Sequence, residues 1–289
     1  MEWLILSVLA STGLFVIFEL TQKQGAKLFP VIIVNYLVCA ICGNALLGPL
    51  HIFQSSTITH PAFYYMLFMG FMFIGTFFLM GTATARAGSS KASVASKMSV
   101  IVPVSASIIL LNQPTSTLQI IGILIGLLCV YFITKQSKKN PSLEPNHALI
   151  LLFVFIGSGL VDTGLNMLSH FFDKAHSNSP VFIATFIFTI AFILGLSAYI
   201  VLMRGKYKLS VKELLFGILL GLVNFFSLYC VFKALQSFQG HTAYYWMLNN
   251  IGVVLLSTLV SVLVFKRKLD NYNYIGLGLA IFAIVLLNI

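Results

Sequence analysis

Lys97 is a basic residue within a long apolar segment, residues 89–111, that also carries the serines Ser93 and Ser96. Ionisable side chains are costly inside a hydrophobic environment, and where they occur they usually serve a function. An ammonium group beside hydroxyl groups can bind a carboxylate, either from a substrate or from the protein itself. The alternative is a structural lysine that reaches the membrane boundary or pairs with an acid. We expect the functional role, because Lys97 lies about 12 Å inside the segment at about 1.5 Å per residue.

Asp162 is an acidic residue near the middle of the apolar segment 147–171. Ser158, Asp162 and Asn166 are spaced four residues apart, which places them on one face of a helix. A carboxyl group in that position can take up and release a proton during a transport cycle. It can equally neutralise Lys97 as a structural partner, and the two roles are compatible.

Neutral polar residues in other apolar segments form a third group. Amide and hydroxyl groups in a dry helix bundle need partners, which they find on neighbouring helices or in a water-filled cavity. We expect cavity lining and substrate contacts for six of them: Thr12, Asn35, Asn224, Tyr245, Asn249 and Asn250.

Glu19 lies in the last turn of the first apolar segment, four residues before Lys23. This spacing favours a salt bridge at the membrane boundary, and a gate or a second proton-coupling site is the alternative. We expect no metal and no cofactor, because neither His170 nor His241 has a second ligand at metal spacing. The four cysteines lie in apolar segments and are expected to pack as small apolar residues.

Ten apolar segments must position these residues. Each is long enough to cross roughly 30 Å of hydrocarbon. They are residues 2–21, 28–49, 61–82, 89–111, 117–135, 147–171, 180–203, 210–234, 241–265 and 271–289. With 59% hydrophobic and 8% charged residues, the composition also predicts an all-α membrane protein and not a soluble one.

Positive charge alternates along the connections between these segments. All but three of the 17 lysines and arginines fall in every second connection; the exceptions are Lys97, Lys174 and Lys233. Short basic loops stay in the cytoplasm, so this pattern predicts an inner-membrane protein with both termini on the non-cytoplasmic side. The net charge of +10 is thereby explained without nucleic-acid binding, for which the sequence has no motif.

The polar stretch 136–146 divides the chain into two halves of five segments, residues 1–135 and 147–289. We expect this stretch to be a cytoplasmic linker. Because five is odd, the second half must enter the membrane from the face opposite to the first. Two inverted repeats are typical of secondary transporters, whose substrate site lies near the membrane midplane between the repeats.

Two local features predict how helices are shaped and packed. Pro103 has no amide hydrogen to donate to the carbonyl of Ser99, so we expect a free acceptor at membrane depth. Gly217-x-x-x-Gly221 is a spacing that lets helices approach closely in lipid.

Ten helices in two halves within 289 residues resemble the drug/metabolite transporter superfamily, in its EamA-like branch. Local matches are the stretch from Ala83 to Ser90 before the fourth helix and the stretch from Lys233 to Ser237 before the ninth. The chain departs from this pattern at Ser11-Thr12-Gly13, where many relatives have Trp-Gly, and at Lys266-Arg267, where relatives often have Glu. The orientation predicted from the charges is also opposite to that of common relatives.

The stretch from Tyr244 to Leu248 is similar to sugar-uptake relatives of the rhamnose-transporter type. We therefore predict a secondary transporter that moves a small polar metabolite by alternating access, with a proton or another ion as the candidate coupling partner. The alternatives are a sugar-uptake permease and a non-transporting or passive bundle. An enzyme is not expected, because the sequence offers no nucleophile–base set or paired acids. Neither the substrate nor the oligomeric state follows from the sequence.

Overall fold

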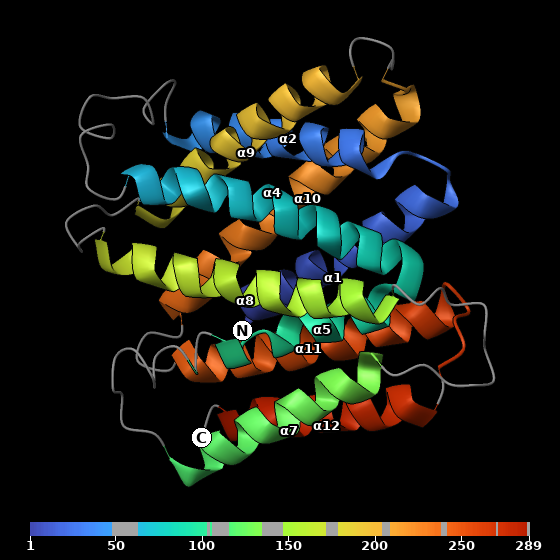
Figure 1. The fold of residues 1–289 in the computed structure, drawn as a ribbon. Coiled ribbons are helices and arrows are strands. Elements are labelled where there is room, and N and C mark those ends of the chain that lie inside the picture. The colour runs from blue at the N-terminus through green and yellow to red at the C-terminus, as the bar shows by residue number, and fades with distance from the viewer. Residues whose placement is uncertain are drawn as a thin grey trace.

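The computed structural model describes residues 1–47, 63–102, 105, 116–134, 147–171, 179–203, 209–237, 242–269 and 271–287. Throughout these ranges the regular secondary structure is helical (Figure 1). The helices are α1 (Glu2–Lys23), α2 (Leu28–Leu47), α4 (Phe63–Ala87), α5 (Ser89–Met98), α7 (Thr117–Thr134), α8 (His147–Phe171), α9 (Ser179–Met203), α10 (Val211–Ser237), α11 (Thr242–Leu263) and α12 (Asn271–Leu287).

Each of the ten apolar segments predicted from the sequence overlaps one of these helices, and α4 extends five residues beyond its predicted end. Within the described ranges, six helices have the length and hydropathy of a membrane span: α1, α2, α4, α8, α9 and α10. Helices α7, α11 and α12 are apolar over shorter stretches. The prediction of an all-α membrane fold with ten helices is therefore confirmed.

The helices pack in pairs that join the two halves of the chain. Helix α7 packs against α12, α2 against α9, and α5 against α11. Six further contacts form three matched sets: α2–α10 with α4–α9, α1–α10 with α4–α8, and α1–α11 with α5–α8. Exchanging α1, α2, α4, α5 and α7 for α8, α9, α10, α11 and α12 converts each contact into its match. Two related halves around an approximate twofold axis would pack in this way; their inverted orientation stays a prediction.

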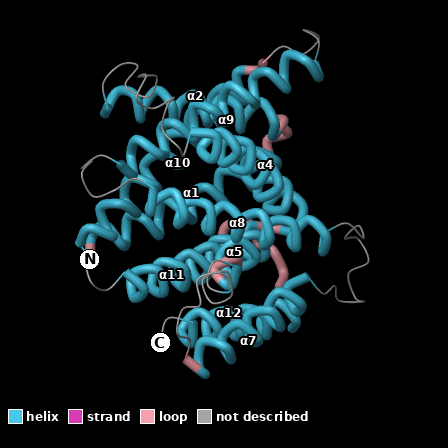
Figure 2. Tube along the Cα trace, turned by 60° about the vertical axis from the view of Figure 1, so that its left-hand side comes forward, coloured by secondary structure: helices cyan, strands magenta, loops and turns pink. Residues whose placement is uncertain are grey.

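The pair α7 and α12 lies at one end of the bundle in both views (Figures 1 and 2). The other helices surround a core in which aromatic side chains join α1, α2 and α4. The rings of Phe18 and Phe77 are 5.0 Å apart, and those of Tyr36 and Phe77 are 5.6 Å apart. The central helices are thus held by interlocked aromatic packing.

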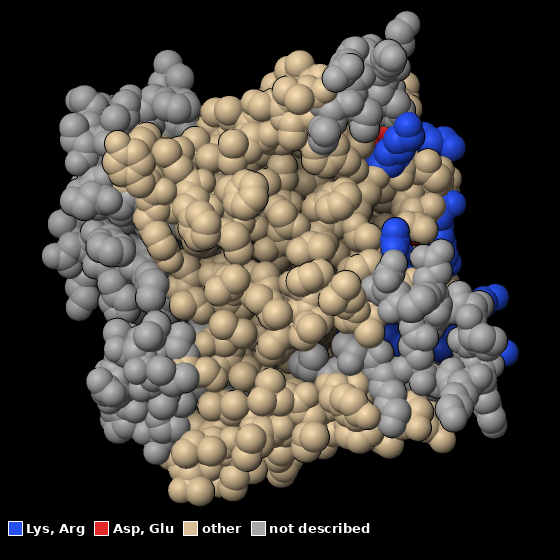
Figure 3. Space-filling model, viewed as in Figure 1, with Lys and Arg blue, Asp and Glu red and all other residues tan. Residues whose placement is uncertain are grey.

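The outer surface is apolar over most of the bundle and basic along one edge (Figure 3). Large apolar side chains such as Ile41, Leu124 and Leu215 are more than 40% exposed, as expected for residues that face lipid. The basic edge is formed where α1 ends and α2 begins, where α4 ends and α5 begins, and where α11 ends. Lys23 lies in the last turn of α1 and Arg86 in the last turn of α4. In this view, the positive charge is therefore concentrated at one end of the helices.

Close packing of α10 on α2 follows from the Gly217-x-x-x-Gly221 spacing. A Cβ atom at Gly217 would collide with Val34, and one at Gly221 would collide with Val38 and crowd the backbone of α2. The packing role predicted for this motif is confirmed.

Candidate functional site

Helices α5 and α8 bring together the two charged residues that the sequence singled out. We call this contact the charged interface and define it by Ser96, Lys97, Ser99, Ser158 and Asp162. Ser96 and Ser158 are joined by a hydroxyl–hydroxyl hydrogen bond of 3.3 Å. The Ser99 hydroxyl is shared between the Ser96 carbonyl at 2.5 Å and Asp162 Oδ2 at 3.2 Å. Lys97 and Asp162 interact electrostatically across the same contact.

The charged interface is accessible although it lies within membrane-spanning helices. Asp162 is exposed, and Lys97 and Ser96 are half-buried. Both charges can therefore meet a solute without unpacking α5 from α8. An ammonium and a carboxylate beside three hydroxyl groups can bind a polar solute through charge-assisted and neutral hydrogen bonds together.

Helix α5 ends at Met98, beside these charges. The chain makes a turn at Ser99 and Val100, and the Val102 amide donates to the Ser99 carbonyl at 2.9 Å. The expectation that this carbonyl stays free is wrong, because a tighter turn supplies the donor that Pro103 lacks. Pro103 itself lies outside the described residues. A helix that breaks at membrane depth next to ionisable groups is typical of transporter binding sites.

A second polar contact joins α1 to α11, which is the match of α5–α8 when the halves are exchanged. We call it the neutral interface and define it by Ser7, Tyr245 and Asn249. The Tyr245 hydroxyl donates to Ser7 Oγ at 3.2 Å, and Ser7 Oγ lies 3.0 Å from the Asn249 side-chain amide. All three side chains are at most 1% exposed.

The single hydroxyl proton of Ser7 fixes how this network is oriented. That proton is donated to the Leu4 carbonyl at 2.8 Å. The contact with Asn249 is then best made by the Asn249 Nδ2 donating to Ser7, because amide oxygen and nitrogen positions are assigned from hydrogen bonding. This orientation turns the Asn249 carbonyl oxygen away from Ser7, to the position where the amide makes no hydrogen bond with the protein.

Other predicted site residues are buried in contacts between helices. Asn224 on α10 donates to Asn35 on α2 at 3.2 Å, while Asn250 and Thr12 are 5% and 3% exposed. Ser93 pairs with Ser257 across the α5–α11 contact, away from α8. The Asn166 side chain lies outside the described residues. Lining of a cavity by this group stays a prediction, since in this conformation the described members are enclosed by protein.

Glu19 has a different partner from the one its spacing indicates. It is fully buried and forms an ion pair with Arg267, the residue that follows α11 by four positions. Lys23, the predicted partner, lies instead over the ring of Phe265 at 4.5 Å. The predicted Glu19–Lys23 salt bridge is therefore wrong. Local spacing cannot detect an ion pair between residues 248 positions apart.

Comparison with known proteins decides the class of this fold. The EamA-like transporter family model matches residues 2–135 and again residues 149–289. The chain belongs to the EamA-like transporter family. An uncharacterized protein of Haemophilus influenzae is 26% identical to this EamA-like chain, over 98% of this chain and 96% of its own length. A crystal structure with 13% identity matches with a TM-score of 0.61, covering 99% of this chain and 94% of that one, which shows a shared fold.

Membership of this family makes the chain a multi-pass membrane transporter. Its partners are accordingly a small-molecule substrate and the surrounding lipid. Transport does not require the chemistry of an enzyme active site, and the polar groups of this EamA-like chain are interpreted as groups that bind and guide a solute.

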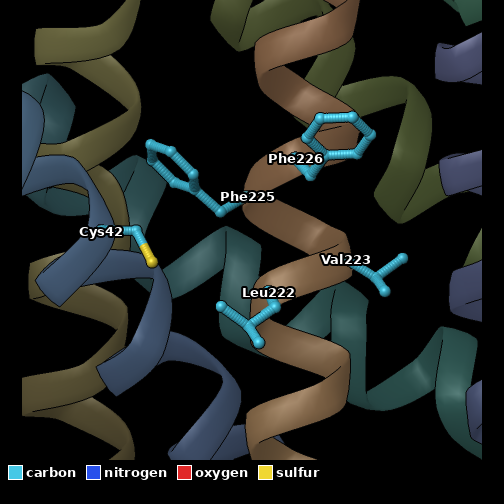
Figure 4. A pocket seen from close by; sticks show the side chains of 5 residues that line it. All are labelled: Cys42, Leu222, Val223, Phe225 and Phe226. Atoms are coloured by element: carbon cyan, nitrogen blue, oxygen red, sulfur yellow. The ribbon is translucent and has the colours of Figure 1, made fainter.

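One pocket of this EamA-like protein lies between α2 and α10 (Figure 4). Cys42 on α2 faces Leu222 and Phe225 on α10, and Val223 and Phe226 complete the lining. These side chains offer almost only apolar surface. The pocket therefore suits hydrocarbon and does not include any residue of the charged or the neutral interface.

Proposed function

We propose that this EamA-like protein is a secondary active transporter of the inner membrane that moves a small polar metabolite by alternating access. The observation that carries the proposal is the charged interface: an accessible lysine and aspartate at a helix break, where the first half meets the second. Ionisable side chains inside a membrane bundle are costly, and where they occur they usually serve a function.

The packing of the helices supports alternating access. The moving units in this proposal are the halves 1–135 and 147–289, connected by the linker 136–146. Helices α5 and α8 belong to different halves, so a rocking motion of one half against the other changes access to Lys97 and Asp162. The basic edge faces the cytoplasm in this proposal, which puts both termini on the opposite side.

Each group of the charged interface has a role in the proposal. Lys97 binds an anionic or acceptor group of the solute, and Asp162 binds a cationic or donor group or carries the coupling proton. Ser96 and Ser99 orient the solute and the carboxylate through hydrogen bonds. Asn166 follows Asp162 by one turn along α8 in the sequence, and the neutral residues Thr12, Asn35, Asn224 and Asn250 contact the solute when the halves move.

Binding is the first measurement that tests this proposal. Purified protein is screened for thermal stabilisation by amino acids, sugars, polyamines and nucleobases, because a ligand of the native state must stabilise it. One chemical class is expected to raise the melting temperature of the wild type and to lose that effect in Asp162→Asn. Glu2→Gln is the matched control: it makes the same acid-to-amide change at an exposed site on α1. Stabilisation by sugars alone would favour the sugar-uptake alternative.

Counterflow in proteoliposomes then separates a carrier from a passive bundle. A carrier exchanges labelled for unlabelled solute without a gradient, whereas a channel or scaffold does not. If the stabilising solute shows no counterflow in the wild type, the transporter proposal is wrong. If Asp162→Asn transports at the wild-type rate with an unchanged pH dependence, proton coupling through Asp162 is wrong, while carrier function stands.

A further inference from the structure

The basic edge of the bundle is closed by side chains that join the two halves. Glu19, at the end of α1, accepts a hydrogen bond from the backbone amide of Ser89, the first residue of α5, at 3.1 Å. The same carboxylate is ion-paired with Arg267, which comes from the second half. Arg267 also donates to the Ala85 carbonyl at the end of α4, at 3.5 Å. One buried carboxylate thus ties together α1, the α4–α5 connection and the segment after α11.

The α5 N-terminus is built to receive this carboxylate. Its N-cap residue is Gly88, with φ of +95°, and has no side chain that could cap the helix. A carboxylate at a helix N-terminus satisfies a free amide and interacts favourably with the helix dipole. The Arg267 side chain passes so close to Gly88 that a Cβ atom there would collide with it. Glycine is therefore favoured at this position by the backbone conformation, and it also leaves room for the Arg267 side chain in its ion pair with Glu19.

The segment after α11 is bent to bring Arg267 back to α1. Lys266 has φ of +52°, a left-handed conformation that is uncommon for residues other than glycine. It follows Phe265, whose amide donates to the Val260 carbonyl, and precedes Arg267, whose amide donates to the Ser261 carbonyl. Phe265 in turn lies under the ammonium group of Lys23. An uncommon backbone conformation that is fixed by hydrogen bonds on both sides is typical of functional sites.

Two hydroxyl pairs extend the closure from this point toward the membrane centre. Ser90 and Thr258 are hydrogen-bonded at 2.8 Å, and Ser93 is bonded to Ser257 one turn further in. Both pairs join α5 to α11, which are the matching helices of the two halves. Lys97 follows Ser93 by one turn. On the α5–α11 side of the bundle, the ion pair and then the two hydroxyl pairs therefore lie between the basic edge and the level of Lys97.

We propose that Glu19, Arg267 and the hydroxyl pairs Ser90–Thr258 and Ser93–Ser257 form the gate that closes the basic, cytoplasmic end of the transporter. The inference rests on the proposed alternating access. It assigns the present conformation to the state in which the cytoplasmic path is shut. Opening separates Arg267 from Glu19 and frees the α5 N-terminus. The hydroxyl pairs, which are neutral, then separate as well.

Labelling of a cysteine behind the gate tests this assignment without reference to transport. Ser93→Cys is introduced with the native cysteines in place, and inside-out vesicles are treated with a membrane-impermeant maleimide, with the labelling of the parent chain subtracted. Adding Glu19→Gln or Arg267→Gln is expected to raise the labelling rate roughly tenfold, because each removes the charge pair that favours the closed population. Glu19→Ala should raise it further, since glutamine can still accept from the Ser89 amide whereas alanine cannot.

Glu2→Gln controls for the loss of a carboxylate on α1 and is expected to leave the labelling rate unchanged. A second variant, Ser93→Cys with Ser257→Cys, should form a disulfide that abolishes counterflow, and a reductant should restore counterflow to the level of the single cysteine variants. Unchanged labelling in Glu19→Gln, Glu19→Ala and Arg267→Gln overturns the gate and leaves the transporter proposal standing. Faster labelling in these variants, combined with no counterflow by any solute in the wild type, supports the closure and rejects carrier function.

Discussion

The charged and the neutral interfaces occupy matching positions in the two halves but differ in chemistry and access. At α5–α8 a lysine and an aspartate lie beside a helix that breaks at Ser99, and Asp162 is exposed. At α1–α11 a tyrosine, a serine and an asparagine are enclosed, and α11 continues unbroken from Thr242 to Leu263. The matching helix pairs α5–α8 and α1–α11 are therefore expected to have different roles. One pair presents charges to a solute, and the other joins the halves through buried hydrogen bonds between neutral groups.

This difference has a physical basis in what each interface can tolerate. A neutral hydrogen-bonded cluster can be fully buried at little cost, whereas an ion pair in a dry bundle is penalised by desolvation. Access to water or solute at the charged interface reduces that penalty. The turn after α5 contributes as well, because it places the Ser99 hydroxyl 3.2 Å from Asp162 Oδ2. The charged interface is therefore expected to control binding, and the neutral interface to control stability.

Lys97→Met should give the largest effect and would sharpen the comparison most. Methionine keeps the length of the side chain but removes the charge, and a hydrogen bond to a charged group contributes about 1.5–3 kcal/mol, or roughly 10- to 150-fold in affinity. We expect the dissociation constant of the stabilising solute to rise by this factor, measured by thermal shift at increasing solute concentration. The melting temperature without solute should change little, because Asp162 remains accessible to water.

The matched change at the neutral interface is Asn249→Leu, which also replaces a polar group by an apolar one of similar size. It should lower the melting temperature of the protein without solute. If Lys97→Met left affinity unchanged while Asn249→Leu weakened it by tenfold or more, the roles assigned to the two interfaces would be reversed.

Gly159→Ala and Gly252→Ala test how closely the helices approach at the two interfaces. A Cβ atom at Gly159 would collide with Val102 and lie 3.1 Å from the Ser99 carbonyl oxygen, which is backbone and cannot move aside easily. The three atoms nearest to a Cβ atom at Gly252 belong to the Val8 side chain, the closest at 2.9 Å, and this side chain would have to shift slightly. We expect Gly159→Ala to destabilise the protein by about 1–3 kcal/mol through overpacking. Gly252→Ala should be close to neutral, because alanine stabilises a helix by about 1 kcal/mol relative to glycine, and this gain offsets the cost of moving the Val8 side chain.

Unfolding in detergent, followed by thermal shift and by solute binding, measures both variants. Gly159→Ala should also weaken binding, because the clash displaces the turn that carries Ser99. Equal stability of the two variants would show that the turn at Ser99 and Val100 can adjust and does not hold Ser99 against Asp162.

The sequence predicts the helices well because apolar length and charge alternation are local signals. Lys97 and Asp162 could also be identified from it, since a charge within an apolar segment stands out whatever it contacts. Partners are harder to predict because they depend on tertiary packing. Glu19 illustrates this: local spacing favours Lys23, whereas the fold delivers Arg267 through a left-handed turn at Lys266.

Small hydroxyl residues were the hardest to assign from sequence. Serines are frequent in the segment 89–111, and only the crossing of α5 with α8 and α11 separates Ser99, which reaches Asp162, from Ser93, which reaches Ser257. Ser7 gave no signal except its spacing of four residues from Ser11. In the structure it is the centre of the neutral interface, because three groups converge on its one hydroxyl.

Ser7→Ala and Ser99→Ala should give the smallest effects and would separate the two interfaces most finely. Each removes one hydroxyl, and hydrogen bonds between membrane helices contribute about 0.6 kcal/mol on average and at most about 1.7 kcal/mol. Ser7→Ala should lower the melting temperature slightly, because Tyr245 and Asn249 lose a buried partner. It should leave the solute affinity unchanged. Ser99→Ala should leave the melting temperature almost unchanged and weaken binding by roughly three- to tenfold, because Asp162 loses its donor. The crossed pattern matters more than either value: if both variants lost stability and neither lost affinity, the hydroxyl of Ser99 would serve packing alone, and the charged interface would reduce to Lys97 and Asp162.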